Sequence, residues 1–241
     1  MQLIEKYFWI FSTFLVPALY LLVATAFYFV FYVWKNNDWA KHKIQPEHVS
    51  APQLKSELTY SAISLFIFAG TGFLVNVIYK NSLSQIYLTL TVPGIPYFFV
   101  SVLILIFFHD MYFYWTHRLL HFPGWYQKIH SIHHRSSNSS PFTSLSFHPV
   151  EALVQAAVLP LMVLIIPAHP YALFIFILYM VYKNVRGHSG FEFTTAATRN
   201  SKWNIIHSYS IHHNLHHSQG RANYGLYFTI WDRLMRTYRK D

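Results

Sequence analysis

Histidine is the residue whose number and spacing in this chain point to chemistry. The 241 residues include 16 histidines, nearly as many as the 18 lysines and arginines together. Residues three or four positions apart share one face of a helix, so imidazoles at that spacing can converge on one metal ion. Three groups have this spacing: His117 and His121; His130, His133 and His134; and His213, His216 and His217. The pattern therefore predicts metal ligands carried on helices.

His188 follows a long apolar stretch and brings the number of clustered imidazoles to nine. Histidine suits neither lipid contact nor a dry core, whereas neutral imidazoles are stabilised by a metal ion that they share. The chain has no cysteine, which excludes thiolate ligands, and a structural zinc needs only four ligands. Nine imidazoles therefore indicate two ions with room for a substrate, and a redox-capable pair of irons suits an all-nitrogen site best. Zinc could occupy the same ligands in a purified sample.

Other interpretations stay open for parts of this pattern. One histidine pair at helical spacing is common on solvated helices, and histidine can also stabilise a helix end. Two further classes of function are a histidine-rich membrane metal carrier and a haem protein that transfers electrons. A carrier would place ligands near the middle of the membrane spans, and a haem protein would use single histidines facing each other inside helices. The predicted spans contain no histidine.

Long apolar segments must position these histidines. Only 11% of the residues are charged and 54% are hydrophobic, which indicates a membrane protein. A segment of about 20 apolar residues can cross a bilayer as a helix. Three segments are predicted as spans and two more as a helical hairpin: residues 8–34, 60–79 and 86–108, then 152–166 and 171–182. Pro93, Gly94 and Pro96 are expected to break or kink the first turns of the third span.

Basic residues predict the orientation, because lysine and arginine in short loops stay on the cytoplasmic side. If residues 35–59 are cytoplasmic, 16 of the 18 basic residues share that side and only Lys6 and Lys80 lie opposite. The same topology places residues 109–150 and 183–241 on that side, and these two segments hold 13 of the 16 histidines. The net charge of +9 follows from this sidedness, and no nucleic-acid-binding motif competes with it.

The predicted fold is all-α: an integral membrane bundle of three spans plus a helical hairpin, with a helical cap on the cytoplasmic face that carries the histidines. Residues 1–108 would form the N-terminal spans. Residues 109–241 would form the histidine-bearing catalytic region, including the hairpin at about 152–182. No internal repeat or linker separates the two regions, so one structural unit is expected.

The order of the histidine groups in a membrane protein resembles the fatty acid hydroxylase and sterol desaturase superfamily of non-haem di-iron oxidases. Residues 141–151 resemble the segment after the second histidine group in sterol C5-desaturases. Residues 223–225 and 230–234 resemble the C-terminal signature of the superfamily, although Met235 and Arg236 stand where an aromatic residue and a glycine are usual. The resemblance covers about residues 110–238, over half of the chain.

The resemblance implies that all nine clustered histidines bind metal: His117, His121, His130, His133, His134, His188, His213, His216 and His217. Some side chains would contact a ligand rather than the metal, and the candidates are His148, His212, Asn184, Asp110, Tyr114, Arg118 and Glu151. Asn184 stands where some hydroxylases of the superfamily have another histidine ligand. For Arg118 and Glu151 the alternatives are that Arg118 reaches toward the membrane surface and that Glu151 stabilises a helix start.

The implied activity is an O2-dependent oxidation that hydroxylates or desaturates an unactivated position of a sterol-like or fatty acyl membrane lipid. It implies two iron ions, O2 as co-substrate, and an external redox partner such as cytochrome b5, ferredoxin or a reductase. The active site is expected on the cytoplasmic face of a bacterial inner membrane or the endoplasmic reticulum. The remaining histidines are expected to be ordinary interface or loop residues: His42, His48, His109, His169 and His207.

Overall fold

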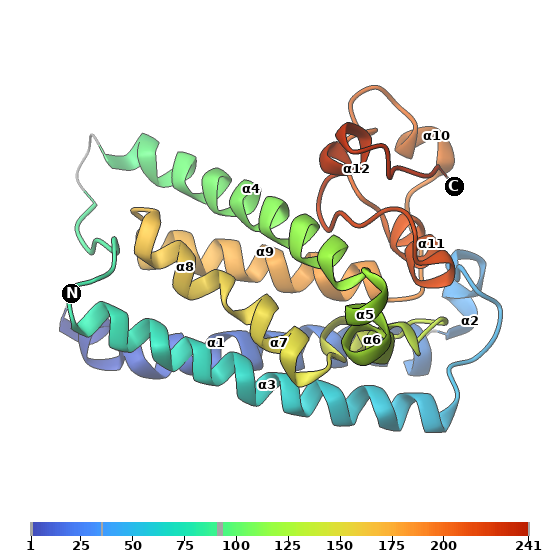
Figure 1. The fold of residues 1–241 in the computed structure, drawn as a ribbon, viewed down its shortest axis with the longest axis horizontal. Helices are drawn as coiled ribbons and strands as arrows, with labels where there is room; N and C mark the ends of the chain where they lie inside the picture. Colours follow the sequence, from blue (N-terminus) through green and yellow to red (C-terminus); the bar gives the residue numbers. More distant parts are fainter. Residues whose placement is uncertain (1, 35, 91–93, 241) are drawn as a thin grey trace.

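The protein is a bundle of long helices with short helices gathered at one end (Figure 1). The computed structural model describes residues 2–34, 36–90 and 94–240, and in these ranges it contains isolated β-bridges but no strand. The bundle helices are α1 (Gln2–Tyr28), α3 (Ala51–Lys80), α4 (Gly94–Leu120), α7 (Pro149–Ala156), α8 (Val158–Ile165) and α9 (Pro170–His188). The predicted all-α class is confirmed.

Short helices and helical turns complete the chain. They are α2 (Asn36–Trp39), α5 (Pro123–Trp125), α6 (Ser131–His134), α10 (Ala196–Arg199), α11 (Ser210–Gln219), α12 (Ile230–Leu234), the 3₁₀ turns η2 (Ala40–His42) and η4 (Pro141–Leu145), and the π-helical segments η1 (Phe29–Trp34) and η3 (Tyr126–His130). Figure 1 shows α5, α6 and α11 at the end of the bundle where α4 and α9 finish. The segments that carry the histidines are therefore brought to one end.

Three helices are long and apolar enough to cross a membrane: Tyr7–Trp34, Ala51–Lys80 and Gly94–Leu120. Their outer faces expose large apolar side chains, such as Leu22 (67% exposed) and Phe66 (81% exposed). Exposed apolar area of this extent requires lipid rather than water. The predicted three spans and integral membrane character are confirmed, and α7, α8 and α9 form the predicted hairpin.

The third span begins later than predicted. Residues 86–90 are extended rather than helical, because the backbone at residues 85–87 forms hydrogen bonds with the hairpin. Gln85 N donates to Val163 O at 2.7 Å, and Tyr87 N donates to Ala168 O at 3.3 Å. Pro96 lies in the first turn of α4, where a missing N–H costs nothing, so it does not kink the helix. Pro93, also expected to break the span, and Lys35, in the predicted basic loop, lie outside the described residues. As a result, α4 continues past residue 108 and carries His117 itself.

Gly72 permits a close approach between α1 and α3. A Cβ atom at Gly72 would lie 2.0 Å from the carbonyl oxygen of Ser12 and 3.0 Å from Cα of Thr13. A Cβ atom at Gly70, two residues earlier on α3, would meet no described atom within 4 Å. The two glycines therefore have different roles although they lie in the same helix.

Gly72→Ala is expected to destabilise the protein by about 1–3 kcal/mol, because the backbones of α1 and α3 would have to move apart. Gly70→Ala is the matched control and should leave stability unchanged or raise it by up to about 1 kcal/mol, since alanine favours the helix. The measurement is the unfolding midpoint of both variants in the same detergent. Equal midpoints would contradict the close contact at Gly72.

Candidate metal centre

The nine clustered histidines come together as two groups of imidazoles. Within each group, one potential ligand atom per residue lies within 4.8 Å of those of all the other members. The first group is His117, His121, His130, His134 and His216, and the second is His133, His188, His213 and His217. The structure thus brings together all nine histidines that were predicted as metal ligands, whereas His148 and His212 belong to neither group.

The two groups cut across the sequence clusters. Consecutive residues on a helix point about 100° apart, so adjacent histidines cannot face the same point. On α6, His134 joins the first group while His133 joins the second, and on α11 His216 and His217 divide in the same way. These two adjacent pairs therefore link the two groups, which places the groups side by side.

Nitrogen–nitrogen distances in the first group suit ligands of a single ion. The Nε2 atom of His216 lies 3.1 Å from Nε2 of His121 and 3.1 Å from Nε2 of His134. The Nε2 atoms of His117 and His130 are also 3.1 Å apart. With metal–nitrogen bonds of about 2.0–2.1 Å, neighbouring ligands at octahedral or tetrahedral angles lie about 2.8–3.4 Å apart.

Contacts on the outer side of the rings fix which nitrogen carries the proton. Nδ1 of His117 lies 2.9 Å from the carbonyl oxygen of Tyr224, and Nδ1 of His216 lies 2.7 Å from that of Ala222. A carbonyl oxygen can only accept, so both Nδ1 atoms donate and the Nε2 lone pairs face the group. His188 in the second group is held in the same way, with Nδ1 2.8 Å from the carbonyl oxygen of Asn184.

Glu151 makes the corresponding contact with a carboxylate. Its Oε1 lies 2.7 Å from Nδ1 of His130, and both side chains are 1% exposed. When His130 donates from Nδ1, its Nε2 lone pair faces the Nε2 lone pair of His117 at 3.1 Å. Two lone pairs at this distance repel each other unless a cation lies between them. The first group therefore fits a metal ion better than it fits a network of hydrogen bonds.

The second group leaves even more of its hydrogen-bonding capacity unused. Nε2 of His188 lies 3.2 Å from Nε2 of His133 and 2.7 Å from Nε2 of His213. Among the described residues, no hydrogen-bond partner exists for Nδ1 of His133, Nδ1 of His213 or either ring nitrogen of His217. A buried polar atom without a partner costs about 1–3 kcal/mol. A cation would lie between the facing Nε2 atoms of His188, His133 and His213 and would use one ring nitrogen of His217, so this donor set also fits a metal.

Burial keeps the rings outside the membrane helices neutral. It lowers the pKa of His134 to about 4. Burial, together with repulsion from neighbouring imidazoles, lowers the pKa of His213 and His216 well below the usual range. Neutral imidazole is the form that binds a metal ion. Both groups are therefore ready for coordination at neutral pH.

Acidification is expected to destabilise the metal-free protein. Below about pH 6.5 the unfolded chain protonates its histidines while the buried rings stay neutral, so the unfolded state binds more protons and stability falls as pH decreases. Each histidine held neutral contributes a loss of about 1.4 kcal/mol per pH unit until its folded pKa is reached, at about pH 4 for His134. The unfolding midpoint measured from pH 7.5 to about 5 checks this, and a midpoint that rises on acidification would contradict it.

The other predicted supporting residues mostly hold the backbone. Nδ1 of His148 accepts from Val150 N at the start of α7, and Nδ1 of His212 accepts from Tyr209 N at the start of α11. Asp110 accepts from Tyr227 N at 2.8 Å and from Phe228 N at 3.3 Å, which fastens the C-terminal segment to α4. The Arg118 guanidinium donates to the hydroxyl of Tyr114. The amide of Asn184 donates to the carbonyl oxygen of Ser144.

Main-chain groups make contacts that the sequence patterns did not indicate. The carbonyl oxygens of Tyr224 and Ala222 leave no signal, because every residue has one. Asp232 could have been identified from the sequence, since it lies in residues 230–234, which resemble the C-terminal signature of the superfamily. Its carboxylate accepts from Tyr224 N at 2.9 Å and from Gly225 N at 2.8 Å, and it thereby positions the Tyr224 carbonyl against His117.

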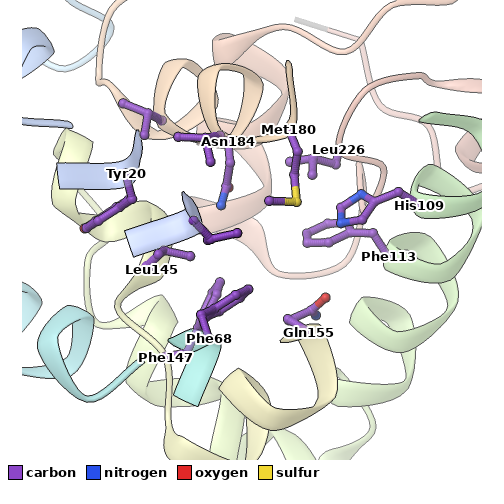
Figure 2. A pocket seen from close by; sticks show the side chains of 13 residues that line it. Tyr20, Phe68, His109, Phe113, Leu145, Phe147, Gln155, Met180, Asn184 and Leu226 are labelled. Carbon is purple, nitrogen blue, oxygen red and sulfur yellow. The ribbon is translucent and has the colours of Figure 1, made fainter. Parts of the chain in front are cut away.

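A small apolar cavity of about 30 Å³ lies within the bundle (Figure 2), and two of its aromatic walls contact the histidine groups. The Phe113 ring, which lines it, has its centroid 5.0 Å from that of His117, and the Phe147 ring lies equally close to His133. The cavity is lined by Val16, Tyr20, Phe68, His109, Phe113, Leu145, Phe147, Gln155, Met180, Val181, Asn184, Val185 and Leu226. His109 is thus buried in the bundle, and its prediction as an interface or loop residue was wrong.

A second, polar cavity of about 330 Å³ opens on the first group, with His121, Tyr126, Gln127 and Arg221 in its lining. The surface of this half of the protein is basic. Among described residues 94–240, the side chains of all four carboxylates are at least about nine-tenths buried, whereas seven lysines and arginines are exposed. The histidine groups therefore adjoin an apolar space on one side and a polar, basic surface on another.

Comparisons with known proteins agree on one family. The sequence model described as Fatty acid hydroxylase matches residues 102–237. The chain is 26% identical to the Delta(7)-sterol 5(6)-desaturase ERG3A of Gibberella zeae, with 96% of this chain and 61% of that protein covered. It is 30% identical to the Lathosterol oxidase of Mus musculus, with 90% and 69% covered.

Similarity extends to a further fungal relative, the Delta(7)-sterol 5(6)-desaturase ERG3 of Saccharomyces cerevisiae, at 28% identity over 96% of this chain and 60% of that protein. The chain thus spans about three fifths of the length of these two fungal relatives. No solved structure gives a significant match.

Proposed function

The chain belongs to the fatty acid hydroxylase family, and on this premise we propose that it is a membrane oxidoreductase that hydroxylates or desaturates an unactivated position of a lipid. The observation that carries the proposal is the pair of imidazole groups, with Nε2 lone pairs turned inward, at the wall of an apolar cavity. Such a site combines ligands for a redox metal with an adjacent apolar space. The names of the sterol-oxidising relatives favour a sterol-like lipid over a fatty acyl chain.

Two iron ions are proposed as the metals, one held by the five-histidine group and one by the four-histidine group. When bound, they would supply the redox chemistry that couples the reduction of O2 to the oxidation of a C–H bond. The residues of this chain position the metals: the carbonyl oxygens of Tyr224, Ala222 and Asn184 and the carboxylate of Glu151 orient the imidazoles. An ordinary structural zinc site would need only four ligands.

The substrate and the electrons are proposed to arrive from different sides. The lipid would approach from the bilayer, on the side of the apolar cavity, and would place a carbon near the histidine groups. An external redox protein would deliver electrons over the polar cavity, where His121 is partly exposed beside Arg221. This half of the protein is proposed to face the cytoplasm, in a bacterial inner membrane or the endoplasmic reticulum, because basic residues predominate there.

Lipid analysis of a host with and without the gene, grown in air, tests the function. Cells with the wild-type protein should accumulate a lipid that has lost two hydrogens or gained one oxygen atom. His133→Ala should behave like the deletion, while His48→Ala, at an exposed histidine, should behave like wild type. Identical lipid profiles in all four strains would overturn the proposal.

Metal exchange tests the identity of the ions. Purified protein reconstituted with iron should oxidise lipid when given O2 and a reductant, whereas protein reconstituted with zinc should bind two ions without activity. Activity of the zinc-loaded protein that matches the iron-loaded protein would contradict a redox role for the metal.

A further inference from the structure

A buried carboxylate on α3 belongs to neither histidine group. Glu57 is 1% exposed, and within the described ranges it forms no ion pair. Its Oε1 accepts from the hydroxyl of Thr143 at 2.9 Å and from the amide of Gln53 at 2.7 Å, and its Oε2 accepts from the hydroxyl of Ser140. Removing a charge from water is costly even when hydrogen bonds compensate for it, so packing alone does not account for glutamate here.

The hydroxyl groups of Ser140 and Thr143 are directed at Glu57 by their other contacts. The Ser140 hydroxyl accepts from Phe142 N at 3.2 Å, and the Thr143 hydroxyl accepts from Ser140 N at 2.9 Å. Each hydroxyl has one proton, which it donates to the carboxylate, and an ionised carboxylate only accepts. Glu57 therefore completes the hydrogen bonds of the turn that begins η4, and it fixes that turn to α3.

The N-terminal spans hold η4 at a second point. The carbonyl oxygen of Phe142 accepts from the Ser61 hydroxyl at 2.8 Å and lies 3.1 Å from the hydroxyl of Tyr20. Tyr20, Glu57 and Ser61 all precede residues 102–237, the part of the chain that the family model matches. The position of η4 is therefore set by helices outside that match.

Two contacts lead from η4 to the four-histidine group. The carbonyl oxygen of Ser144 accepts from the Asn184 amide at 2.8 Å, and the carbonyl oxygen of Asn184 lies 2.8 Å from Nδ1 of His188. Phe147 lies two residues after η4, and its ring centroid is 5.0 Å from that of His133. Both histidines belong to the four-histidine group. A shift of η4 would therefore act on this group first.

We propose that Glu57 is a positioning residue for the metal of the four-histidine group. It acts through η4, which holds Asn184 behind His188 and leads into Phe147 beside His133. Without the carboxylate, two buried hydroxyl groups lose their acceptor and the turn loses its attachment to α3. The inference rests on the proposed function in taking this group as a metal site.

Cobalt(II) binding to the purified full chain in detergent tests the proposal, because the visible absorption of cobalt reports its ligand geometry. Two backgrounds separate the groups: His216→Ala leaves the four-histidine group intact, and His133→Ala leaves the five-histidine group intact. Adding Glu57→Ala should lower cobalt affinity about tenfold in the His216→Ala background, the lower end of the effect of lost support behind a ligand. In the His133→Ala background the change should be about twofold or less.

Leu58→Ala is the matched control, since Leu58 is 45% exposed on the same helix. It should leave cobalt affinity unchanged in both backgrounds. Glu57→Gln keeps one acceptor oxygen and should lose less affinity than Glu57→Ala, and Thr143→Val removes one contact from the η4 side and should lose about threefold. These two variants decide the matter if Glu57→Ala does not fold. Affinity that matches the control, or that falls equally in both backgrounds, overturns the inference.

Amide hydrogen exchange of the metal-free protein supplies a second measurement. Relative to residues 212–217 of α11, Glu57→Ala should speed exchange at least about threefold in residues 140–147 and in residues 185–188 at the end of α9. Faster exchange confined to residues 140–147 would overturn the inference, because the effect would then not reach His188. If wild-type protein binds no cobalt, the proposed function fails, whereas hydrogen exchange still decides the role of Glu57.

Discussion

His216→Ala is expected to abolish lipid oxidation and to remove the metal of the five-histidine group. His216 is fully buried, and its Nε2 is the atom that approaches both His121 and His134 at 3.1 Å. Loss of an outer contact to a ligand typically costs 10–100-fold in metal affinity or activity, so loss of the ligand itself should cost more than about 100-fold. Product formation and metal content of the purified variant are the measurements.

His48→Ala is the control for this variant, because His48 is exposed and belongs to neither group. It should keep wild-type activity and metal content. If His216→Ala still binds two equivalents of metal, His216 is not a ligand. If it binds one equivalent, the remaining ion identifies the four-histidine group as an independent site.

Glu151→Ala is expected to lower metal affinity or activity by about 10–100-fold, although Glu151 is not among the proposed ligands. The change leaves Nδ1 of His130 without its carboxylate partner at 2.7 Å, so the ring loses both its orientation and its added basicity. Glu151→Gln should lose less, because the amide oxygen can still accept from Nδ1. The iron concentration needed for half-maximal activity separates the two variants.

Leu153→Ala supplies the matched control on the same helix, since Leu153 is 54% exposed on α7. It should require the same iron concentration as wild type. If the iron dependence of Glu151→Ala also stays at the wild-type value, the contact to His130 has only a structural role. If the iron concentration needed for half-maximal activity is highest for Glu151→Ala, lower for Glu151→Gln and lowest for wild type, the result supports the orienting role of Glu151.

The sequence was sufficient to predict the features that follow from a continuous apolar segment or from a regular spacing of residues. Apolar length located the spans, and the spacing of eight histidines, with His188 after an apolar stretch, picked out the nine imidazoles that the fold brings together. It did not predict how they divide, because the division depends on how α6 and α11 are rotated about their axes. His133 and His134 are equivalent in a spacing pattern, yet they belong to different groups.

Long-range contacts account for most of the remaining differences. Tyr87 lies in an apolar run that favours helix, but its backbone and that of the preceding Gln85 pair with the hairpin near Ala168, and α4 begins later. His109 looks ordinary in the sequence, and only the packing of α4 against α7 and α9 places it in a cavity. Such features depend on residues distant in the chain and have no local pattern.

The continuity of α4 and α9 has a consequence for how the protein sits in its bilayer. Each of these helices extends from the apolar bundle to a clustered histidine, His117 on α4 and His188 as the last residue of α9. The distance from membrane midplane to the histidines is therefore set by a count of helical residues, at 1.5 Å each. This distance is fixed by the protein, whereas the depth of the surrounding lipid changes with bilayer thickness. A bilayer that is too thick or too thin would therefore change which position of a bound lipid lies beside the histidines.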